Sequence, residues 1–194
     1  MDVRRSRSCP PHALLLVALL PIGCKGGGTG GPIAVTPAMY RVDKTLVDVT
    51  DGDEISLEFP PQGGHVLFVG ARVRGLEDDL AELRGRLRNP DDDTIIAEEG
   101  RTVAFDPSPD DPGLKIPDLR NYANVANVAV CPSYTGLDHS GRSFILEVTV
   151  TGTSSNQIGS ATRLVVPTCQ QADPTERQYC VCDCAANYFL GKCS

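Results

Sequence analysis

Cysteines are the residues of this chain whose type and spacing offer the most chemistry. Six of the eight lie in its C-terminal part, and three of these occupy alternate positions in a C-x-C-x-C run. An even set of cysteines in an exported protein favours disulfides, whereas clustered thiolates can hold zinc. The candidates are Cys131, Cys169, Cys180, Cys182, Cys184 and Cys193.

Three disulfides are the favoured interpretation, with one between Cys131 and Cys169 near the ends of the last core strands. The other four cysteines would then staple a small tail that has too little core of its own. The alternative is a tetrahedral sulfur site in that tail. Structural zinc sites use wider spacing more often, and an oxidising compartment removes free thiolates.

Catalytic motifs are missing from the sequence. His139 has Asp138 and Ser140 as neighbours, but adjacent residues point in different directions and do not make a catalytic triad. The chain has no G-x-S-x-G, H-E-x-x-H or P-loop pattern. We therefore expect no enzyme and no cofactor, with His65 and His139 in surface loops or turns.

Acidic turns raise the question of calcium. Asp51, Asp53 and Glu54 lie between presumed strands, where β-sandwich modules can hold calcium with carboxylates. The clusters at 91–93 and 106–111 are similar, and none meets the EF-hand pattern. Solvated turn acids are the favoured interpretation, so the calcium candidates are weak.

Charge excludes some partners. The chain has 18 Lys+Arg against 25 Asp+Glu and no Trp, which argues against a nucleic-acid binder. A row of arginines would form one basic stripe if their strands pair, although ion-paired surface is the simpler expectation. These residues are Arg72, Arg74, Arg84, Arg86 and Arg88.

The N-terminus has the organisation of an export signal. Arginines at 4, 5 and 7 precede the apolar run 13–20, which is too short to span a bilayer. The next residues, Pro21-Ile22-Gly23-Cys24, resemble the lipobox of bacterial lipoproteins. Gly23 occupies the small position before the cut, and Pro21 stands where that family usually has Leu.

This resemblance implies that residues 1–23 are a signal peptide and that Cys24 carries fatty acyl chains such as palmitate. Two or more chains suffice for stable membrane anchoring. Residues 24–34 would be the lipidated cysteine and a Gly-rich tether. Lys25 after the cysteine favours the outer over the inner membrane, by resemblance to enterobacterial sorting.

The elements that must position these residues are strands. Apolar and polar residues alternate through much of 35–169, with turn signals such as Pro60-Pro61-Gln62-Gly63-Gly64 between them. The expected strands are 45–50, 54–59, 66–73, 101–105, 144–150 and 161–166. Their expected inward residues are Ile55, Leu57 and Phe59; Leu67, Val69, Ala71 and Val73; and Phe144, Leu146, Val148 and Val150.

The segment 76–88 fits two patterns. Its leucines recur at helical spacing, but 81–88 also alternates, and Gly85 is unfavourable inside a helix. We favour a strand there, and a long connection with a short helical turn over 106–127. The sequence thus predicts an all-β, immunoglobulin-like β-sandwich of about seven to nine short strands over 35–169. A disulfide-rich tail follows over 170–194.

The function expected from these features is non-catalytic. The protein would be exported and lipid-anchored to the cell envelope, presenting its β-sandwich for binding, adhesion or envelope assembly. Its partners would be the membrane, through Cys24, and a protein or envelope polymer that contacts edge strands or end loops. The alternatives are a metal-binding lipoprotein with a Cys-rich tail and, less favoured, a hydrolytic enzyme.

Overall fold

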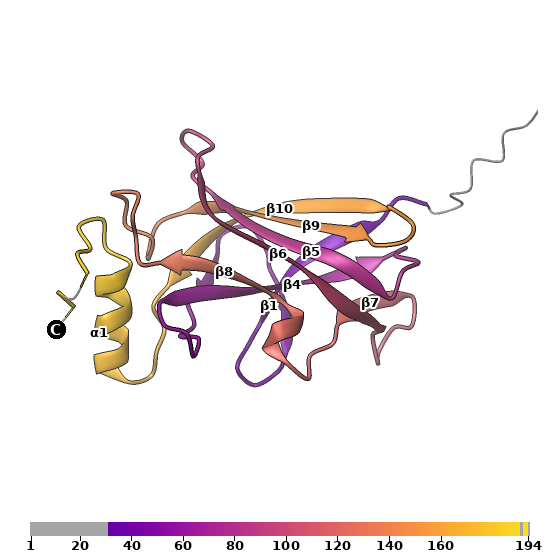
Figure 1. Ribbon diagram of the computed structural model, residues 1–194, viewed down its shortest axis with the longest axis horizontal. Coiled ribbons are helices and arrows are strands. Elements are labelled where there is room, and N and C mark those ends of the chain that lie inside the picture. The colour runs from indigo at the N-terminus through magenta and orange to yellow at the C-terminus, as the bar shows by residue number, and fades with distance from the viewer. Residues whose placement is uncertain (1–30, 191, 194) are drawn as a thin grey trace, which may run out of the picture.

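The computed structural model describes residues 31–190 and 192–193 and is mostly β (Figure 1). The expected all-β class is confirmed in coarser form, as a mostly β fold with one helix, and residues 1–23 and Cys24 lie outside the described part. The strands are β1 (Ala34–Tyr40), β2 (Leu46–Asp48), β3 (Asp53–Ser56), β4 (His65–Arg74), β5 (Leu80–Arg88), β6 (Ile95–Pro107), β7 (Leu114–Pro117), β8 (Ala126–Cys131), β9 (Phe144–Gly152) and β10 (Ile158–Thr168). A 3-10 turn, η1 (Tyr122–Asn124), and one helix, α1 (Pro174–Asp183), complete the described elements.

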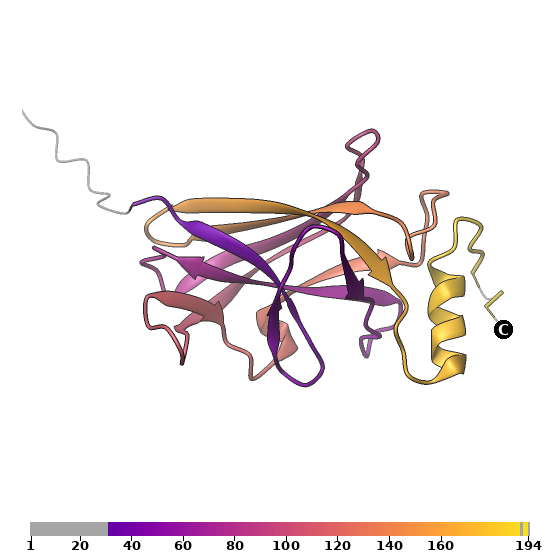
Figure 2. The same ribbon diagram turned by 180° about the vertical axis from the view of Figure 1, so that it is seen from behind.

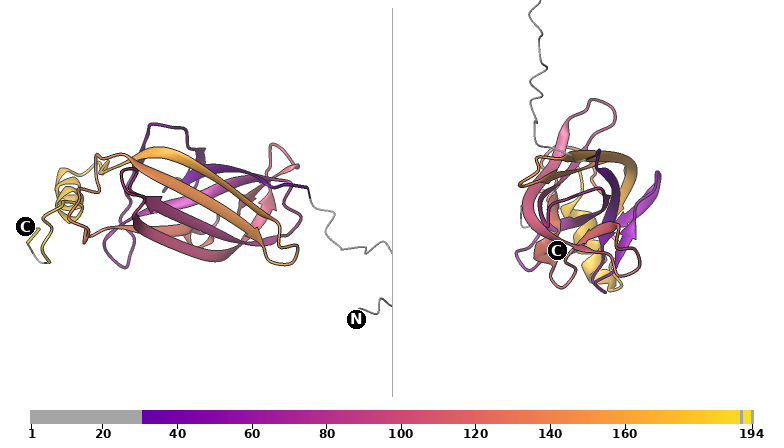
Figure 3. Two further views of the ribbon diagram at one scale, coloured as in Figure 1. Left: turned by 90° about the horizontal axis from the view of Figure 1, so that it is seen from above. Right: turned by 90° about the vertical axis from the view of Figure 1, so that its right-hand side faces the viewer.

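The strands form one mixed sheet in the order β2-β1-β4-β7-β6-β5-β9-β10-β3, with β8 also paired to β4. All pairs are antiparallel except β3 with β10. The long strand β6 changes partners along its length, from β5 through residue 104 to β7 from residue 105. The sheet curls around a single main core, as the end view in Figure 3 shows.

The period-two alternation explains the core. The inward residues expected on β4 and β9 are all fully buried, which confirms both sets. Strand β4 is buried on its other face too, because Val66 and Phe68 pack with Tyr40 and Leu46 in a second cluster. Phe59 departs from the expected inward set, because the chain leaves β3 after residue 56 and its ring is 58% exposed.

Within the segment 76–88, residues 80–88 form the predicted strand, which begins four residues later than we expected, and Gly85 has a packing role there. A Cβ at this position would lie 2.8 Å from Val128 Cγ2 and 3.1 Å from Val69 Cβ. Strand β5 therefore approaches β4 and β8 across the core more closely than a side chain would allow. The helical spacing of the leucines has no structural counterpart.

The two ends of the described chain lie far apart. The chain enters β1 at one end of the long axis, whereas α1 lies at the other end (Figures 1 and 2). The loops that follow β3 and β8 reach the α1 end, so this end combines segments from three parts of the sequence. The tail residues are therefore presented away from the start of the domain.

Candidate functional site

Helix α1 was not predicted, although its start is encoded in the sequence. Asp173 is the N-cap, and its carboxylate accepts hydrogen bonds from the backbone N–H groups of Thr175 and Glu176. Pro174 follows at the first helical position, where its missing N–H is harmless. The Asp-Pro-Thr-Glu run was thus a readable signal for this helix.

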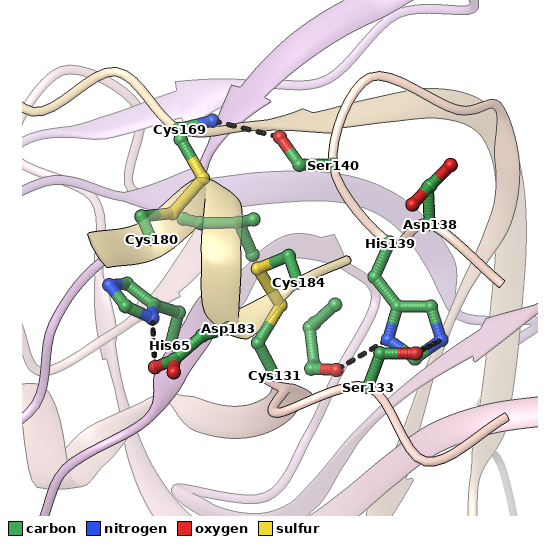
Figure 4. The surroundings of a disulfide bond; sticks show 12 residues. His65, Cys131, Ser133, Asp138, His139, Ser140, Cys169, Cys180, Asp183 and Cys184 are labelled. Atoms are coloured by element: carbon green, nitrogen blue, oxygen red, sulfur yellow. Dashed lines mark hydrogen bonds and ion pairs between the residues drawn. A yellow bond between two sulfur atoms is a disulfide. The ribbon is translucent and has the colours of Figure 1, made fainter. Parts of the chain in front are cut away.

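Disulfides attach α1 to the β domain (Figure 4). Cys184 bonds Cys131 at the end of β8, and Cys180 bonds Cys169 just after β10. The expected Cys131–Cys169 bond is therefore wrong. The physical reason is that α1 lies between the ends of β8 and β10. Cys180 and Cys184 are four residues apart and therefore lie on one face of the helix, from which each reaches one strand end. A third disulfide, Cys182–Cys193, closes the tail on itself.

The disulfides also occupy the cysteines of the expected sulfur site. Cys180, Cys182 and Cys184 each bond a different partner, so none of the three is a free thiol. The sulfurs of Cys180 and Cys184 lie within 4.8 Å of a His65 ring nitrogen, but both sulfurs are in disulfides. The oxidised tail thus offers no thiolate for metal at this point.

His65 and Asp183 form a buried pair between β4 and α1. Nδ1 of His65 lies 3.3 Å from Oδ2 of Asp183, and the two side chains are 1% and 3% exposed (Figure 4). Burial lowers the pKa of the imidazole, and the facing carboxylate acts in the opposite direction. Burial also raises the pKa of Asp183. The surface position that we expected for His65 is wrong, because the tail helix covers it.

His139 is likewise buried, which corrects our second expectation for the histidines. Its Nδ1 lies 2.7 Å from the carbonyl oxygen of Val130, which can only accept, so this nitrogen donates. Nε2 then accepts from the hydroxyl of Thr135 at 2.7 Å. Asp138 instead accepts from the backbone N–H of Ala186, so no triad forms. His139 therefore stabilises the loop of residues 130–139 through hydrogen bonds made by both ring nitrogens.

This arrangement predicts a loss of stability in acid. Burial lowers the pKa of His139 below its ordinary value of 6.5, so the unfolded chain binds a proton more readily than the folded protein. The free energy of unfolding is unaffected by this group above pH 6.5 and falls as the pH drops below it. Urea denaturation between pH 8 and 5 measures the slope.

The matched variant for this prediction is His139→Asn, whose side chain has an N–H donor but no titrating group. We expect its free energy of unfolding to fall less steeply below pH 6.5 than that of the natural protein. Equal slopes for the two proteins would contradict the assignment of the acid sensitivity to His139.

An aromatic hollow lies beside the buried pair. The ring centroids of Phe59 and His65 are 5.5 Å apart, and Tyr179 of α1 lies 6.4 and 6.1 Å from them. The three rings border a hollow of about 250 Å³ whose wall also includes Gln171, Thr175 and Glu176. On its other side, Tyr179 borders a smaller hollow of about 180 Å³ with Gln178 and Lys192.

Exposed apolar side chains gather around the same helix. They lie on α1, on the segment that follows it, or in ring contact with a tail residue. Such a concentration at one end is typical of a contact surface. The side chains, which we call the distal apolar surface, are Phe59, Tyr134, Tyr179, Val181, Phe189 and Leu190.

The calcium candidates occupy the β2–β3 turn (Asp51) and the start of β3 (Asp53 and Glu54), and the two aspartates accept hydrogen bonds there. The Asp51 carboxylate accepts from the backbone N–H of Leu164, and that of Asp53 accepts from the N–H and hydroxyl of Thr50. These bonds from Thr50 hold the pKa of Asp53 below its usual range. Glu54 is exposed and borders, with Asp53, a hollow of about 310 Å³ between β2 and β3.

The arginine row does not form one stripe. Strands β4 and β5 do not pair, because β5 lies between β6 and β9. Each of the five arginines instead contacts a carboxylate, which agrees with the expectation of an ion-paired surface. Hydrogen bonds from Arg86 hold the pKa of Glu98 below its usual range, with Arg84 adding to the effect.

Comparison with known proteins adds no family to this description. No protein-family model matches the chain, and no curated protein matches it. The site therefore rests on its own geometry. Four of its residues were not predicted to meet, Phe59, Gln171, Tyr179 and Asp183, and they come together only because α1 folds back against β4.

Proposed function

We propose that this protein is an exported envelope lipoprotein that holds a non-catalytic β module off a membrane and presents the distal apolar surface to a partner. The observation that carries the proposal is that this surface lies on and around α1, at the opposite end of the domain from the start of β1. A tether that precedes β1 would leave this end free. Tyr and Phe side chains at such a place are the usual anchors of a protein contact.

The proposed module is an immunoglobulin-like β-sandwich. The pairings β1–β4–β8 and β5–β9–β10 correspond in chain order to the A-B-E and C-F-G strands of that architecture. The extra strand β6 beside β5 corresponds to a C′ strand. The disulfides of this chain differ in place from the inter-sheet disulfide of antibody domains, because they secure the tail.

The proposed anchor is acylated Cys24, with the outer membrane favoured over the inner one. Three disulfides among the described residues agree with an oxidising, exported location. None of the helices found between residues 31 and 193 has the length and hydrophobicity of a membrane-spanning segment. A lipid on Cys24 would supply the attachment.

A non-catalytic role is supported by the state of both histidines. His65 is covered by α1 and faces Asp183, while His139 has both ring nitrogens engaged by its own loop. Within the described part of the chain, neither ring is joined to both a free nucleophile and a substrate-sized opening. The partner that we propose is a protein or an envelope polymer.

The anchor is tested by replacing Cys24 with serine. We expect the natural protein in the membrane fraction and Cys24→Ser in the soluble fraction, since the acceptor sulfur is lost. Intact mass of the natural protein should correspond to a chain that starts at Cys24 and carries acyl groups. Six further cysteines should react with an alkylating reagent only after reduction.

A control variant, Tyr134→Ala, changes the distal apolar surface without touching the anchor and should stay in the membrane fraction. The proposal is contradicted if Cys24→Ser remains membrane-bound and is cleaved at the same position. An unacylated mass for the natural protein would contradict it as well.

A further inference from the structure

The hollow beside α1 combines three aromatic faces with unpaired polar groups. Phe59, His65 and Tyr179 lie at mutual ring distances of 5.5 to 6.4 Å, and because His65 is only 1% exposed, a small group in the hollow would contact mainly the exposed rings of Phe59 and Tyr179. Aromatic rings that converge in this way attract cations, because each ring face carries negative electrostatic potential. The volume of about 250 Å³ suits a short alkyl chain with a charged head.

One polar group in the wall, the Gln171 amide, favours a hydrogen-bonding cation. The side-chain amide nitrogen of Gln171 donates to the carbonyl of Leu57 at 2.6 Å, which orients the amide. Its oxygen Oε1 is buried and has no hydrogen-bond partner among the described residues. Buried acceptors are normally satisfied, so this oxygen would take an N–H donor, which a ligand in the hollow can supply once the Gln171 side chain turns to expose it.

The charge in the wall has the matching sign. Glu176 borders the hollow and has no ion-pair partner within residues 31–190 and 192–193. Burial lowers the pKa of His65, so its ring is uncharged at neutral pH and does not repel a cation. Arg177 of the tail does not line the hollow, because its guanidinium is engaged by the backbone carbonyl of Gln171 at 2.6 and 2.9 Å, and Lys192 borders the other hollow.

We propose that this hollow binds a primary alkylammonium group, presented as a lysine side chain of a partner protein. Phe59 and Tyr179 would face the cation, Gln171 Oε1 would accept from its N–H, and Glu176 would balance its charge. This inference rests on the proposed function, whose partner it narrows to a lysine-bearing protein. A protein is favoured over a lipid headgroup because the hollow borders α1, which lies at the opposite end of the domain from the start of β1.

The probe is n-butylammonium chloride, added to the purified full-length protein in its oxidised form at neutral pH. Aromatic NMR signals of Phe59 and Tyr179 should shift and saturate at millimolar concentration. The uncharged analogue 1-butanol should bind at least about tenfold more weakly, since it lacks the charge. N-acetyl-lysine amide should produce the same shifts as butylammonium.

Variants distinguish binding in this hollow from non-specific binding of the probe elsewhere on the protein. Tyr179→Leu and Glu176→Gln should each weaken butylammonium binding at least about fivefold, because each removes one attraction to the cation. Tyr134→Leu removes an exposed ring of the same distal surface outside the hollow and should bind as the natural protein does. Far-UV circular dichroism and melting temperature check that all three variants are folded.

Several outcomes would overturn the inference. These are absence of saturable shifts, equal binding of 1-butanol, or unchanged affinity in both Tyr179→Leu and Glu176→Gln. Binding to phosphatidylethanolamine vesicles without binding to N-acetyl-lysine amide would also overturn it. If ammonium binding fails while Cys24→Ser still releases the protein from membranes, only the ligand class is rejected. Failure of the Cys24→Ser test alone rejects the anchor.

Discussion

Replacing Cys131 and Cys184 together by alanine should lower the free energy of unfolding by about 4 kcal/mol. This disulfide joins residues 53 apart in sequence, so its loss frees a large amount of conformational entropy in the unfolded chain. Both cysteines are buried, and their loss also removes packing beneath α1. Urea denaturation followed by far-UV circular dichroism measures the change.

The matched control is the double variant Cys182→Ala/Cys193→Ala. Its disulfide spans only 11 residues, and the chain-entropy relation places its effect about 1 kcal/mol lower. It should leave α1 attached through the other two disulfides. If the two double variants are equally stable, the Cys131–Cys184 disulfide contributes no more to the stability of the domain than the Cys182–Cys193 disulfide does, which contradicts the prediction.

The second large effect should come from separating the buried pair. We expect His65→Leu to cost about 3 kcal/mol at pH 7, because it leaves the Asp183 carboxylate buried without its partner. Asp183→Leu should cost less, since the imidazole that remains is uncharged. The double variant His65→Leu/Asp183→Leu should be close to the natural protein, because neither a buried charge nor an unpaired nitrogen remains.

The pH dependence of His65→Leu gives an independent check. Burial already raises the pKa of Asp183, and removing His65 takes away the influence that lowers it. A folded-state pKa above the unfolded value means that the folded protein gains protons first as the pH falls. The cost of His65→Leu should therefore shrink in acid, as the carboxyl becomes neutral.

An exposed ion pair provides the control. Arg142 contacts Asp91 with side chains 38% and 72% exposed, and Arg142→Leu should cost less than about 1 kcal/mol. Urea denaturation at pH 7 and pH 5 covers all these variants. A cost for His65→Leu no greater than that for Arg142→Leu would show that the buried pair contributes nothing special.

Local patterns predicted much of the β domain. Alternation placed the inward residues of β4 and β9 correctly, and Gly85 helped to identify β5 as a strand. Such patterns succeed because burial of one face of a strand repeats every second residue. They failed at Phe59, where the strand had already ended and the same alternation continued into a turn.

The candidate site was not predictable in the same way. Asp173 and Pro174 mark where α1 begins, but nothing local shows that the helix lies against His65. The partners at the site come from the loop after β3, from β4 and from the tail, more than 100 residues later. Pairing of cysteines has the same character, because many pairings are compatible with one sequence.

The amino-acid sequence is therefore sufficient for the strand pattern, the conditions for disulfides and the resemblance of residues 1–24 to a lipoprotein signal, since each depends on neighbouring residues alone. Tertiary structure decided which cysteines pair, why both histidines are buried and where an aromatic hollow opens beside α1. These features depend on how distant segments pack around one core. Long-range packing follows from the whole chain at once, and no local window contains it.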